Sequence, residues 1–395
     1  DANQRLKISD RAQIVFDFHQ TIDVMQEQRK GKDMRGTTKK GIGPCYAAKA
    51  DRSGLRICDL MTDNFYDFEH KYRKILGRTL VSWPELKDIH GSEEQIVDEL
   101  EKYKKLKTRL EPMVVDTVNF VHNLIQKQNE SLLIEGANAT MLDIDYGTYP
   151  NVTSSNCSIG SACTGLSIPP QLITEVFGVT KAYCTRVGTG PFPTEQGENN
   201  GMGSAIQRPD LKILERKPGD IDVENQFEVG EYLQRVGNEY GTTTKRARRC
   251  GWIDCVALNY ANKINYFKAF AMTKLDVLDK LPKVAICYSY TILPKSMRYR
   301  SGELREEEIE ERKENEKGGR GVKIDYFPAD ANILHRCKPN YIWMDGWLED
   351  TTQIRNFEKL PVNAKKFILK CEEILNVPIK WIGVGPERDA MIIRD

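Results

Sequence analysis

Apolar residues recur at intervals of three or four along several stretches of the chain, which predicts amphipathic helices. The first covers residues 10–31, where Asp10 is suited to cap the helix and Gly31 to end it. A second is expected to start at Ser92, because the sequence Ser-Glu-Glu-Gln matches a capping box. Further helices are expected over residues 113–128, 170–177 and 362–375.

Short apolar runs bounded by polar or glycine residues predict strands between these helices. We expect strands over residues 132–134, 183–187, 270–276 and 379–382. Alternation of helices and strands is typical of an α/β fold with a mostly parallel central sheet and flanking helices. The chain is expected to form a single domain over residues 1–395. Two polar stretches are expected to be exposed insertions in it, near residues 196–228 and 301–323.

The run 270–276 ends in Lys274 and Asp276, two charged side chains two positions apart. Alternation along a strand would place both on one side at its carboxyl end, where open α/β sheets bind ligands. A carboxylate there can accept the ring N–H and the exocyclic amine of guanine, while a lysine stem covers the base. Gly383 and Gly385, after the strand 379–382, permit close backbone approach to the same base. We predict guanine selection, with an ordinary surface ion pair as the alternative.

Three further segments are rich in polar side chains that suit anionic ligands. Residues 36–56 combine hydroxyls, glycines and cations in a predicted loop that suits a phosphate monoester, or is a flexible basic surface loop. Residues 135–156 follow a predicted strand as a long polar loop, where binding sites are often built. Residues 241–252 place four cations after three consecutive threonines, which suits an anionic substrate held beside nucleotide phosphates, or is a bare basic surface.

Composition excludes several classes of function. With 58 basic and 57 acidic residues, the net charge of +1 gives no overall attraction to nucleic acid or to an anionic membrane. No apolar run of about 18 residues predicts a membrane span, and no signal peptide is evident. The ten cysteines form no Cys-x-x-Cys pair and no zinc site, so reduced thiols are expected. We predict a cytoplasmic protein with small-molecule partners and no metal ligand within these residues.

Several of these segments resemble the signature segments of the adenylosuccinate synthetase family. They are Gly41-Ile-Gly-Pro-Cys-Tyr through Arg52-Ser-Gly-Leu-Arg56, Glu135-Gly-Ala-Asn138, Val152-Thr-Ser-Ser-Asn156, Gly190-Pro-Phe-Pro-Thr-Glu195 and Thr273-Lys-Leu-Asp276. The resemblance implies a fold related to P-loop GTPase-like nucleotide-binding folds. It also implies ligation of L-aspartate to IMP through a 6-phosphoryl-IMP intermediate, with GTP as substrate and Mg²⁺ as cofactor, giving adenylosuccinate, GDP and phosphate.

The same resemblance implies roles for individual residues. The IMP-binding residues would be Thr38, Arg52, Asn138, Thr153 and Arg246. Asn138 would position the purine, and Arg52 would act across the interface of a homodimer. The aspartate-binding residues would be Thr242, Thr243, Thr244, Lys245, Arg246, Ala247 and Arg248. The GTP-binding residues would be Arg248, Lys274, Leu275, Asp276, Gly383, Val384 and Gly385.

The sequence departs from the family pattern in two places. The phosphate loop Gly-Asp-Glu-Gly-Lys-Gly-Lys and the histidine acid that follows it are not found among these residues. We expect the acid, the base and the Mg²⁺ ligands in an N-terminal segment outside them. In the aspartate segment, Lys245 replaces an expected glycine and Ala247 an expected cation, and loss of the glycine is expected to stiffen the loop or to forbid a conformation with positive φ.

Two alternatives to the ligase follow from the same residues. The lack of a phosphate loop favours a catalytically incompetent guanine-nucleotide-binding protein of the same fold. The combination of Thr38, Arg52, Asn138 and Thr153 has no use in such a protein and favours the ligase. Nucleic-acid binding through residues 245–249 is opposed by the near-neutral net charge.

Overall fold

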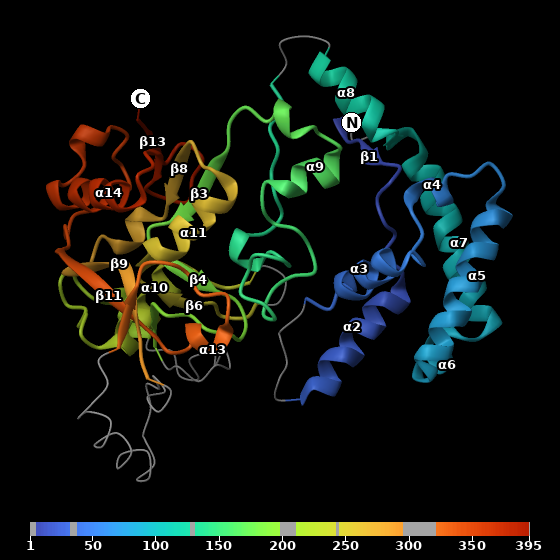
Figure 1. Cartoon of the computed structure of the whole chain (residues 1–395), viewed down its shortest axis with the longest axis horizontal. Coiled ribbons are helices and arrows are strands. Elements are labelled where there is room, and N and C mark those ends of the chain that lie inside the picture. The colour runs from blue at the N-terminus through green and yellow to red at the C-terminus, as the bar shows by residue number, and fades with distance from the viewer. Residues whose placement is uncertain are drawn as a thin grey trace. The chain divides into compact units, whose positions relative to one another are not determined.

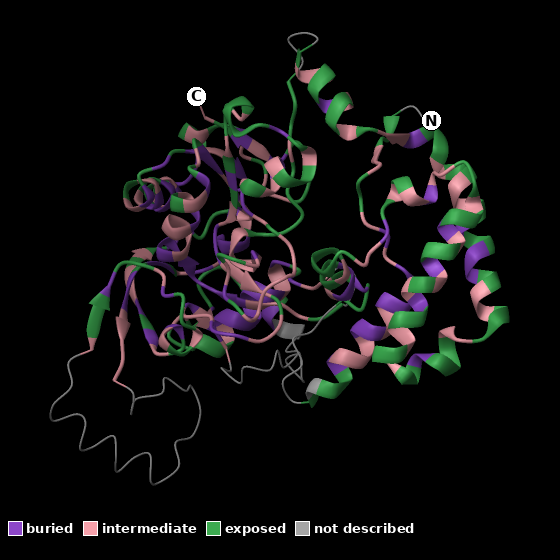
Figure 2. Cartoon of the chain, turned by 45° about the vertical axis from the view of Figure 1, so that its right-hand side comes forward, coloured by how far each residue is buried: buried purple, intermediate pink, exposed green. Residues whose placement is uncertain are grey.

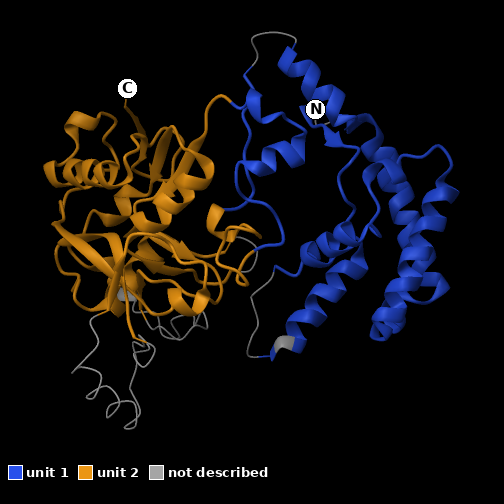
Figure 3. Ribbon diagram, viewed as in Figure 1, with its two compact units in different colours: residues 1–139, 153–173 blue, residues 140–152, 174–395 orange. Residues whose placement is uncertain are grey.

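The computed structural model describes residues 5–31, 38–126, 131–197, 211–241, 245–294 and 321–394 (Figure 1). The chain divides into two compact units (Figure 3). Unit 1 comprises residues 1–139 and 153–173, and unit 2 comprises residues 140–152 and 174–395. The single domain expected over residues 1–395 stays a prediction.

Unit 1 is mainly helical in its described part. Its elements are β1 (Ile8–Ser9), α2 (Asp17–Lys30), α3 (Ile42–Asp51), α4 (Ile57–Leu60), α5 (Phe65–Ser82), η2 (Pro84–Leu86), α6 (Lys87–His90), α7 (Glu93–Leu110), η3 (Glu111–Met113), β2 (Val114–Val115), α8 (Thr117–Gln126), α9 (Gly160–Leu166) and η5 (Pro170–Leu172). Aromatic rings from α5 and α7 pack with Phe16, the residue before α2, in its core, where Phe16, Phe68 and Tyr72 are fully buried. Burial of these large rings stabilises the unit.

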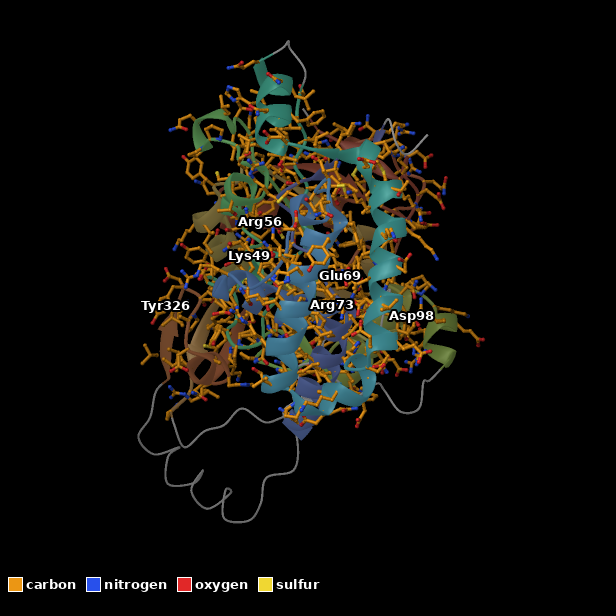
Figure 4. The ribbon with its side chains drawn as sticks, turned by 90° about the vertical axis from the view of Figure 1, so that its right-hand side faces the viewer. Lys49, Arg56, Glu69, Arg73, Asp98 and Tyr326 are labelled. Atoms are coloured by element: carbon orange, nitrogen blue, oxygen red, sulfur yellow. The ribbon has the colours of Figure 1, made fainter. Side chains whose placement is uncertain are left out.

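The capping box predicted at Ser92 is confirmed. Gln95 N–H donates to Ser92 Oγ at 3.2 Å, and the Gln95 side chain accepts from Ser92 N–H at 3.0 Å. Helix α7 therefore begins where the sequence predicts. On its neighbour α5, Glu69 and Arg73 lie one turn apart (Figure 4), and Arg73 also pairs with Glu93 of α7. The Arg73–Glu93 pair links the outer faces of two helices whose inner faces are apolar.

The helix predicted from Asp10 begins at Asp17 instead. Residues before it are extended, because Ile14 N–H donates to Leu55 O at 2.8 Å and Gln13 forms a β-bridge with Arg56. Ile14 is thus buried as part of an extended segment, and its place in the apolar period of the helix was misleading. The end of the helix at Gly31 is as predicted.

Residues 42–51, expected within a loop, form helix α3. The helix starts after Gly41, which has a left-handed conformation with φ 74°. A Cβ at Gly41 would lie 2.7 Å from Gln20 N of α2, so only glycine allows this close packing of α2 and α3. Gly41 N–H also donates to Asp23 Oδ2 at 3.0 Å, which fixes the start of α3 against α2. Pro44 is tolerated because it lies in the first turn.

Unit 2 contains most of the described strands. Its elements are η4 (Thr140–Leu142), β3 (Phe177–Lys181), β4 (Cys184–Arg186), β5 (Glu195–Gln196), η6 (Leu211–Glu215), α10 (Gln226–Val236), β6 (Arg249–Gly251), β7 (Ile253–Asp254), α11 (Cys255–Asn265), β8 (Ala269–Thr273), η7 (Leu275–Leu278), β9 (Lys283–Ile292), β10 (Val322–Ile324), α13 (Ala331–Leu334), β11 (Cys337–Asp345), η8 (Phe357–Lys359), α14 (Val362–Leu375), β12 (Ile379–Gly383) and β13 (Met391–Ile393). The predicted helix 362–375 and strand 379–382 are confirmed.

The sheet that contains the predicted ligand-binding strand is mostly parallel. Its order is β13-β12-β8-β3, with β12 and β3 parallel to β8 and β13 antiparallel at the edge. A second sheet pairs β9 antiparallel with β10 and β11 and parallel with β7, and a third pairs β6 antiparallel with β4 and β5. The α/β fold is as predicted, and the mostly parallel sheet is the one around β8.

Buried residues concentrate in the strands of unit 2 and on the inner sides of the helices of unit 1 (Figure 2). The core of unit 2 includes Ile213 and Ile221, each 2% exposed. Both lie in the stretch 196–228 that was expected to be an exposed insertion, so the part of it around these two residues is packed into the fold instead. Residues 198–210, and 301–320 of the second expected insertion, lie outside the described residues.

Three other expected elements differ from the structure. Residues 132–134 are not in a strand, and Leu133 is 89% exposed. The helix expected over 170–177 is a short 3₁₀ turn, η5, followed by β3, and the helix expected over 113–128 is preceded by β2. Short apolar runs fit a helix or a strand equally well, and pairing with distant strands decides between them.

Candidate functional site

The carboxyl ends of β8 and β12 lie side by side and bring two predicted GTP-binding segments together. Met272 of β8 is opposite Ile382 of β12, so Thr273 and Gly383 end the two strands next to each other. A Cβ at Gly383 would lie 3.3 Å from the Cα of Thr273. Val384 is fully buried, and its N–H donates to Ala390 O at 2.9 Å, which fixes the turn that contains Gly385.

The strand ends at Thr273, and the expected alternation that would place Lys274 and Asp276 on one side of it is wrong. Lys274 has a left-handed backbone with φ 62°, and Leu275 begins the 3₁₀ turn η7. Leu275 is fully buried, whereas Lys274 and Asp276 are both half-buried at the edge of the sheet. The left-handed turn, rather than the strand, therefore sets the directions of these two side chains.

The Asp276 carboxylate has an unused acceptor. Its Oδ1 is buried and has no hydrogen-bond partner among the described residues. Burial raises the pKa of Asp276, while the charge of Lys274 lowers it. A buried carboxylate oxygen without a donor costs free energy, so a ligand that supplies N–H groups would stabilise it. The binding of such a donor is the chemistry predicted for Asp276 from the sequence.

Glu239 stands at the centre of a cationic cluster that the sequence analysis missed. Its side chain is fully buried, and it accepts hydrogen bonds from Lys181 Nζ at 2.8 Å, Tyr183 OH at 2.6 Å and Arg248 Nη1 at 2.8 Å. Lys274 Nζ lies 3.2 Å from its Oε1. We refer to Glu239, Lys181, Arg248 and Lys274 as the Glu239 cluster. The available sequence signal was an isolated acid shortly before the cationic segment, but three of its four partners, Lys181, Tyr183 and Lys274, are distant in sequence.

We expect the Glu239 cluster to make the free energy of unfolding depend on pH in the acidic range. Burial alone would raise the pKa of Glu239, but its bonds to Lys181, Tyr183 and Arg248 lower it to about 2. The folded pKa thus lies below the usual value near 4.5. The ionised carboxylate contributes on the order of 3 kcal/mol above pH of about 5, and this contribution is lost as the pH falls towards 2.

Urea unfolding of the wild type and of Glu239→Gln over this pH range is the measurement. The advantage of the wild type in unfolding free energy should be largest near neutral pH and shrink steadily below pH of about 5. A difference between the two proteins that does not change with pH would contradict the expectation.

The residues around the aspartate segment pair as an antiparallel ladder. Arg248 N–H donates to Glu239 O at 2.8 Å, Tyr240 forms a bridge with Ala247, and Gly241 N–H donates to Arg246 O at 2.8 Å. Thr242, Thr243 and Thr244 lie outside the described residues. Lys245 has φ 54°, the left-handed conformation that favours the glycine expected there. The lysine therefore adopts this conformation at a conformational cost of about 1 kcal/mol.

The predicted IMP-binding residues are divided between the units. Unit 1 contains Thr38, Arg52, Asn138 and Thr153, of which the first three are exposed. Arg52 ends α3 with φ 64°. A Cβ at Gly43 in the first turn of α3 would lie 3.5 Å from Ser154 Oγ, so the segment after Thr153 lies beside α3. Arg246 belongs to unit 2 and is exposed.

A second buried ion pair holds the strands next to the Glu239 cluster. Arg249 of β6 donates to both carboxylate oxygens of Glu195 on β5, and its Nη1 donates to Gly190 O at 2.8 Å and Gly188 O at 3.2 Å. The two side chains are 9% and 5% exposed. Arg249, one of the four cations noted in the sequence, is thus used within the fold and is not available to a ligand.

Neither a metal site nor a membrane helix is found in the described part of the chain. No group of three or more His, Cys, Asp or Glu side chains is placed there to hold a metal ion. Within the same residues, no helix is long and apolar enough to cross a bilayer.

Comparison with known proteins agrees with these features. The family model for adenylosuccinate synthetase matches residues 1–392. The chain is 44% identical to the adenylosuccinate synthetase of Coprinopsis cinerea over 395 residues, which is 100% of this chain and 77% of that protein. It is 43% identical to the enzyme of Lachancea thermotolerans over 404 residues, covering 100% of this chain and 78% of that one.

A solved structure gives the same result for the fold. The fully ligated adenylosuccinate synthetase from Plasmodium falciparum superposes with a TM-score of 0.80 at 37% identity, covering 100% of this chain and 79% of that chain. The match of the family model over almost the whole sequence and the level of identity to both relatives lead to one conclusion: the chain belongs to the adenylosuccinate synthetase family.

Proposed function

We propose that the carboxyl edge of β8 and β12 is the guanine site of this ligase. The reaction of the family, and of this chain, is the GTP-dependent ligation of L-aspartate to IMP. The observation that carries the proposal is the buried Asp276 Oδ1 without a partner among the described residues. Guanine offers a ring N–H and an exocyclic amine side by side, which match the two oxygens of one carboxylate. The alternative of a guanine-nucleotide-binding protein without ligase activity gains no support from the comparisons.

The neighbours of Asp276 complete the proposed guanine site. The Lys274 stem would cover one face of the base, and the close approach of Gly383 to Thr273 leaves backbone rather than side chains at the strand ends. Leu275 and Val384 are buried and would hold the two turns in place, and Gly385 would allow the base to approach the backbone. Arg248, beside Lys274 in the Glu239 cluster, would face the phosphates of GTP.

For IMP and aspartate, we propose the binding residues that the resemblance implies. Thr38, Asn138 and Thr153 supply hydroxyl and amide groups for IMP, with Asn138 accepting or donating at the purine 6-oxygen position. Arg246 and residues 242–248 supply cations and hydroxyls for the carboxylates of aspartate. Lys245 adopts the left-handed backbone conformation that a glycine would favour, and Ala247 forms the β-bridge to Tyr240. The two departures from the family pattern therefore leave the antiparallel ladder that flanks the aspartate segment intact.

We also propose a homodimer in which Arg52 binds the IMP phosphate of the partner subunit. Arg52 is exposed at the end of α3, and no ion pair of Arg52 appears among those found in the described residues. A guanidinium in this position is available to a phosphate from outside its own subunit. Analytical ultracentrifugation would exclude the proposal if the mass were that of one chain at assay concentrations.

Mg²⁺ is used generally by the family, and its role is to neutralise charge on the transferred phosphoryl group. The described residues contain no cluster that fits the ion. We therefore assign no Mg²⁺ ligand to them, and the acid, base and ligands expected outside these residues stay predictions.

We propose a cytoplasmic location. All ten cysteines are free, and six of them are buried. Reduced thiols fit a compartment with a reducing glutathione pool. Fractionation of cells with an antibody to the protein would test this location directly.

A comparison of nucleotides tests the guanine site without any substitution. ITP lacks the exocyclic amine and would lose one charge-assisted hydrogen bond to Asp276, so kcat/KM should fall about ten- to a hundredfold relative to GTP. ATP lacks the ring N–H as well and should fall further. Adenylosuccinate formation with IMP, aspartate and Mg²⁺ is the measurement. ATP as effective as GTP would contradict the proposed site.

A further inference from the structure

Glu239 has no role in binding by itself, because its carboxylate is fully buried beneath three cations. The cations remain partly exposed, with side-chain exposures of 24% for Lys181, 29% for Arg248 and 35% for Lys274. One negative charge faces three positive charges, so the cluster keeps a surplus of two at the edge of the sheet. This surplus suits an anionic ligand, and without the carboxylate the cations would repel one another.

The backbone on both sides of Glu239 fixes its carboxylate. Its N–H donates to the O atom of Gln234, in the last turn of α10, at 2.8 Å. Its C=O accepts from Arg248 N–H at 2.8 Å. Gln234 Nε2 donates to Arg248 O at 2.9 Å, which ties the same two chain segments a second time. The Glu239 backbone is therefore held in place, and its carboxylate binds the longer, more flexible cationic side chains.

The cations come from three separate parts of unit 2. Lys181 ends β3, Lys274 follows β8, and Arg248 precedes β6. Lys181 Nζ also donates to Thr185 Oγ1 at 2.9 Å, and Lys274 Nζ donates to Gly237 O next to the turn that carries Glu239. The carboxylate thus links two parts of unit 2. One is the end of β8, where the proposed guanine site lies, and the other is the antiparallel ladder that flanks the aspartate segment.

We infer that Glu239 is a positioning residue that aligns Arg248 with Lys274, so that the guanine end and the anion-binding end of the site keep a fixed spacing. The inference rests on the proposed roles of Arg248 and Lys274. No other described carboxylate bonds to either cation among the ion pairs of the structure. Because this one carboxylate holds both cations, its loss would weaken the binding of GTP and of aspartate together.

Glu239→Gln in the full-length enzyme is the first test. Gln keeps the shape but not the charge, so KM for GTP and KM for aspartate should each rise about tenfold or more, with a smaller change in kcat. The matched control is Glu231→Gln. Glu231 is a buried acid on α10 that pairs at 2.9 Å with Arg235, a residue outside the Glu239 cluster. This control should lose similar stability and keep both KM values.

A double-mutant cycle separates positioning from general damage. If Glu239 acts through Arg248, Glu239→Gln should change KM for aspartate less than about threefold in an Arg248→Ala background. A full effect in that background, or equal effects of Glu231→Gln, would overturn the inference. Should Glu239→Gln not fold, Glu239→Asp keeps the charge and shortens the reach, and the same rise in both KM values is expected; unchanged values would overturn the inference.

The single variants distinguish this inference from the proposed function. If Arg248→Ala and Lys274→Ala leave KM for GTP and aspartate unchanged, the proposed assignment of both residues fails. If they raise KM while Glu239→Gln does not, the assignment stands and only the positioning role of Glu239 fails.

Discussion

Asp276→Asn is expected to lower kcat/KM for GTP by about two to four powers of ten. The carboxylate would accept two N–H donors of guanine, and hydrogen bonds to a charged group are each worth about 1.5–3 kcal/mol. The amide keeps one acceptor and points a donor at the exocyclic amine of guanine. Since the Asp276 Oδ1 atom is buried, water cannot replace the lost bond. Steady-state kinetics of adenylosuccinate formation measure this loss.

The same variant should gain activity with XTP, whose 2-oxo group accepts from the new amide. A rise in the ratio of XTP to GTP turnover shows that the side chain reads the base, because a general loss of structure lowers both rates. The control is Asp350→Asn. Asp350 is an exposed acid whose charge acts on Asp276, and its removal should leave the preference for GTP unchanged. An Asp276→Asn enzyme that still prefers GTP over XTP as strongly as the wild type would exclude guanine recognition by this residue.

Arg249→Ala is expected to cost about 3–5 kcal/mol of unfolding free energy. It leaves the buried Glu195 carboxylate and the carbonyls of Gly188 and Gly190 without their donors. The cost arises mainly from the unpaired carboxylate in a dry environment, because the intact pair itself contributes little net stability. The midpoint of urea unfolding, with the slope unchanged, is the measurement.

A surface arginine provides the comparison for this variant. Arg73 also bonds to two acids, but its side chain and that of Glu93 are 33% and 71% exposed. Arg73→Ala should cost no more than about 1 kcal/mol. The double variant Glu195→Gln with Arg249→Met should recover part of the loss, since no buried charge remains. If Arg249→Ala unfolds at the same urea concentration as Arg73→Ala, burial of the pair has no effect on its energetics.

Helices with strong local signals could be predicted from the sequence. The Ser92 capping box marks the start of α7, and the apolar period of α14 predicts the helix over its full length. These signals are local, because a cap and an apolar face are formed by residues within one helix. Helix α3 gave no such signal. Only Pro44 and Cys45 of it are buried, and its start depends on the left-handed Gly41 packed against α2.

The candidate site could be predicted only in part for the same reason. Lys274 and Asp276 were found from a short motif at a strand end, although the left-handed turn that directs them was not. Glu239 could not be found, because its role arises from partners that lie 58 residues before it and 35 residues after it in the chain. The extended segment before α2 was missed because its pairing partner, Leu55, is equally remote. Contacts of this kind become visible only in the folded chain.

The discontinuous course of unit 1 has a consequence for biosynthesis. A ribosome delivers residues in order, and domains generally fold as they emerge. Residues 140–152 emerge before unit 1 is complete, yet they belong to unit 2, where Tyr260 OH donates to Tyr146 O at 2.8 Å and Arg186 Nη1 donates to Thr148 Oγ1 at 2.9 Å. Arg186 and Tyr260 are translated later. The nascent chain therefore holds this segment without its unit 2 partners while residues 153–173, which complete unit 1, are still emerging, and no single cleavage yields both units as uninterrupted polypeptides.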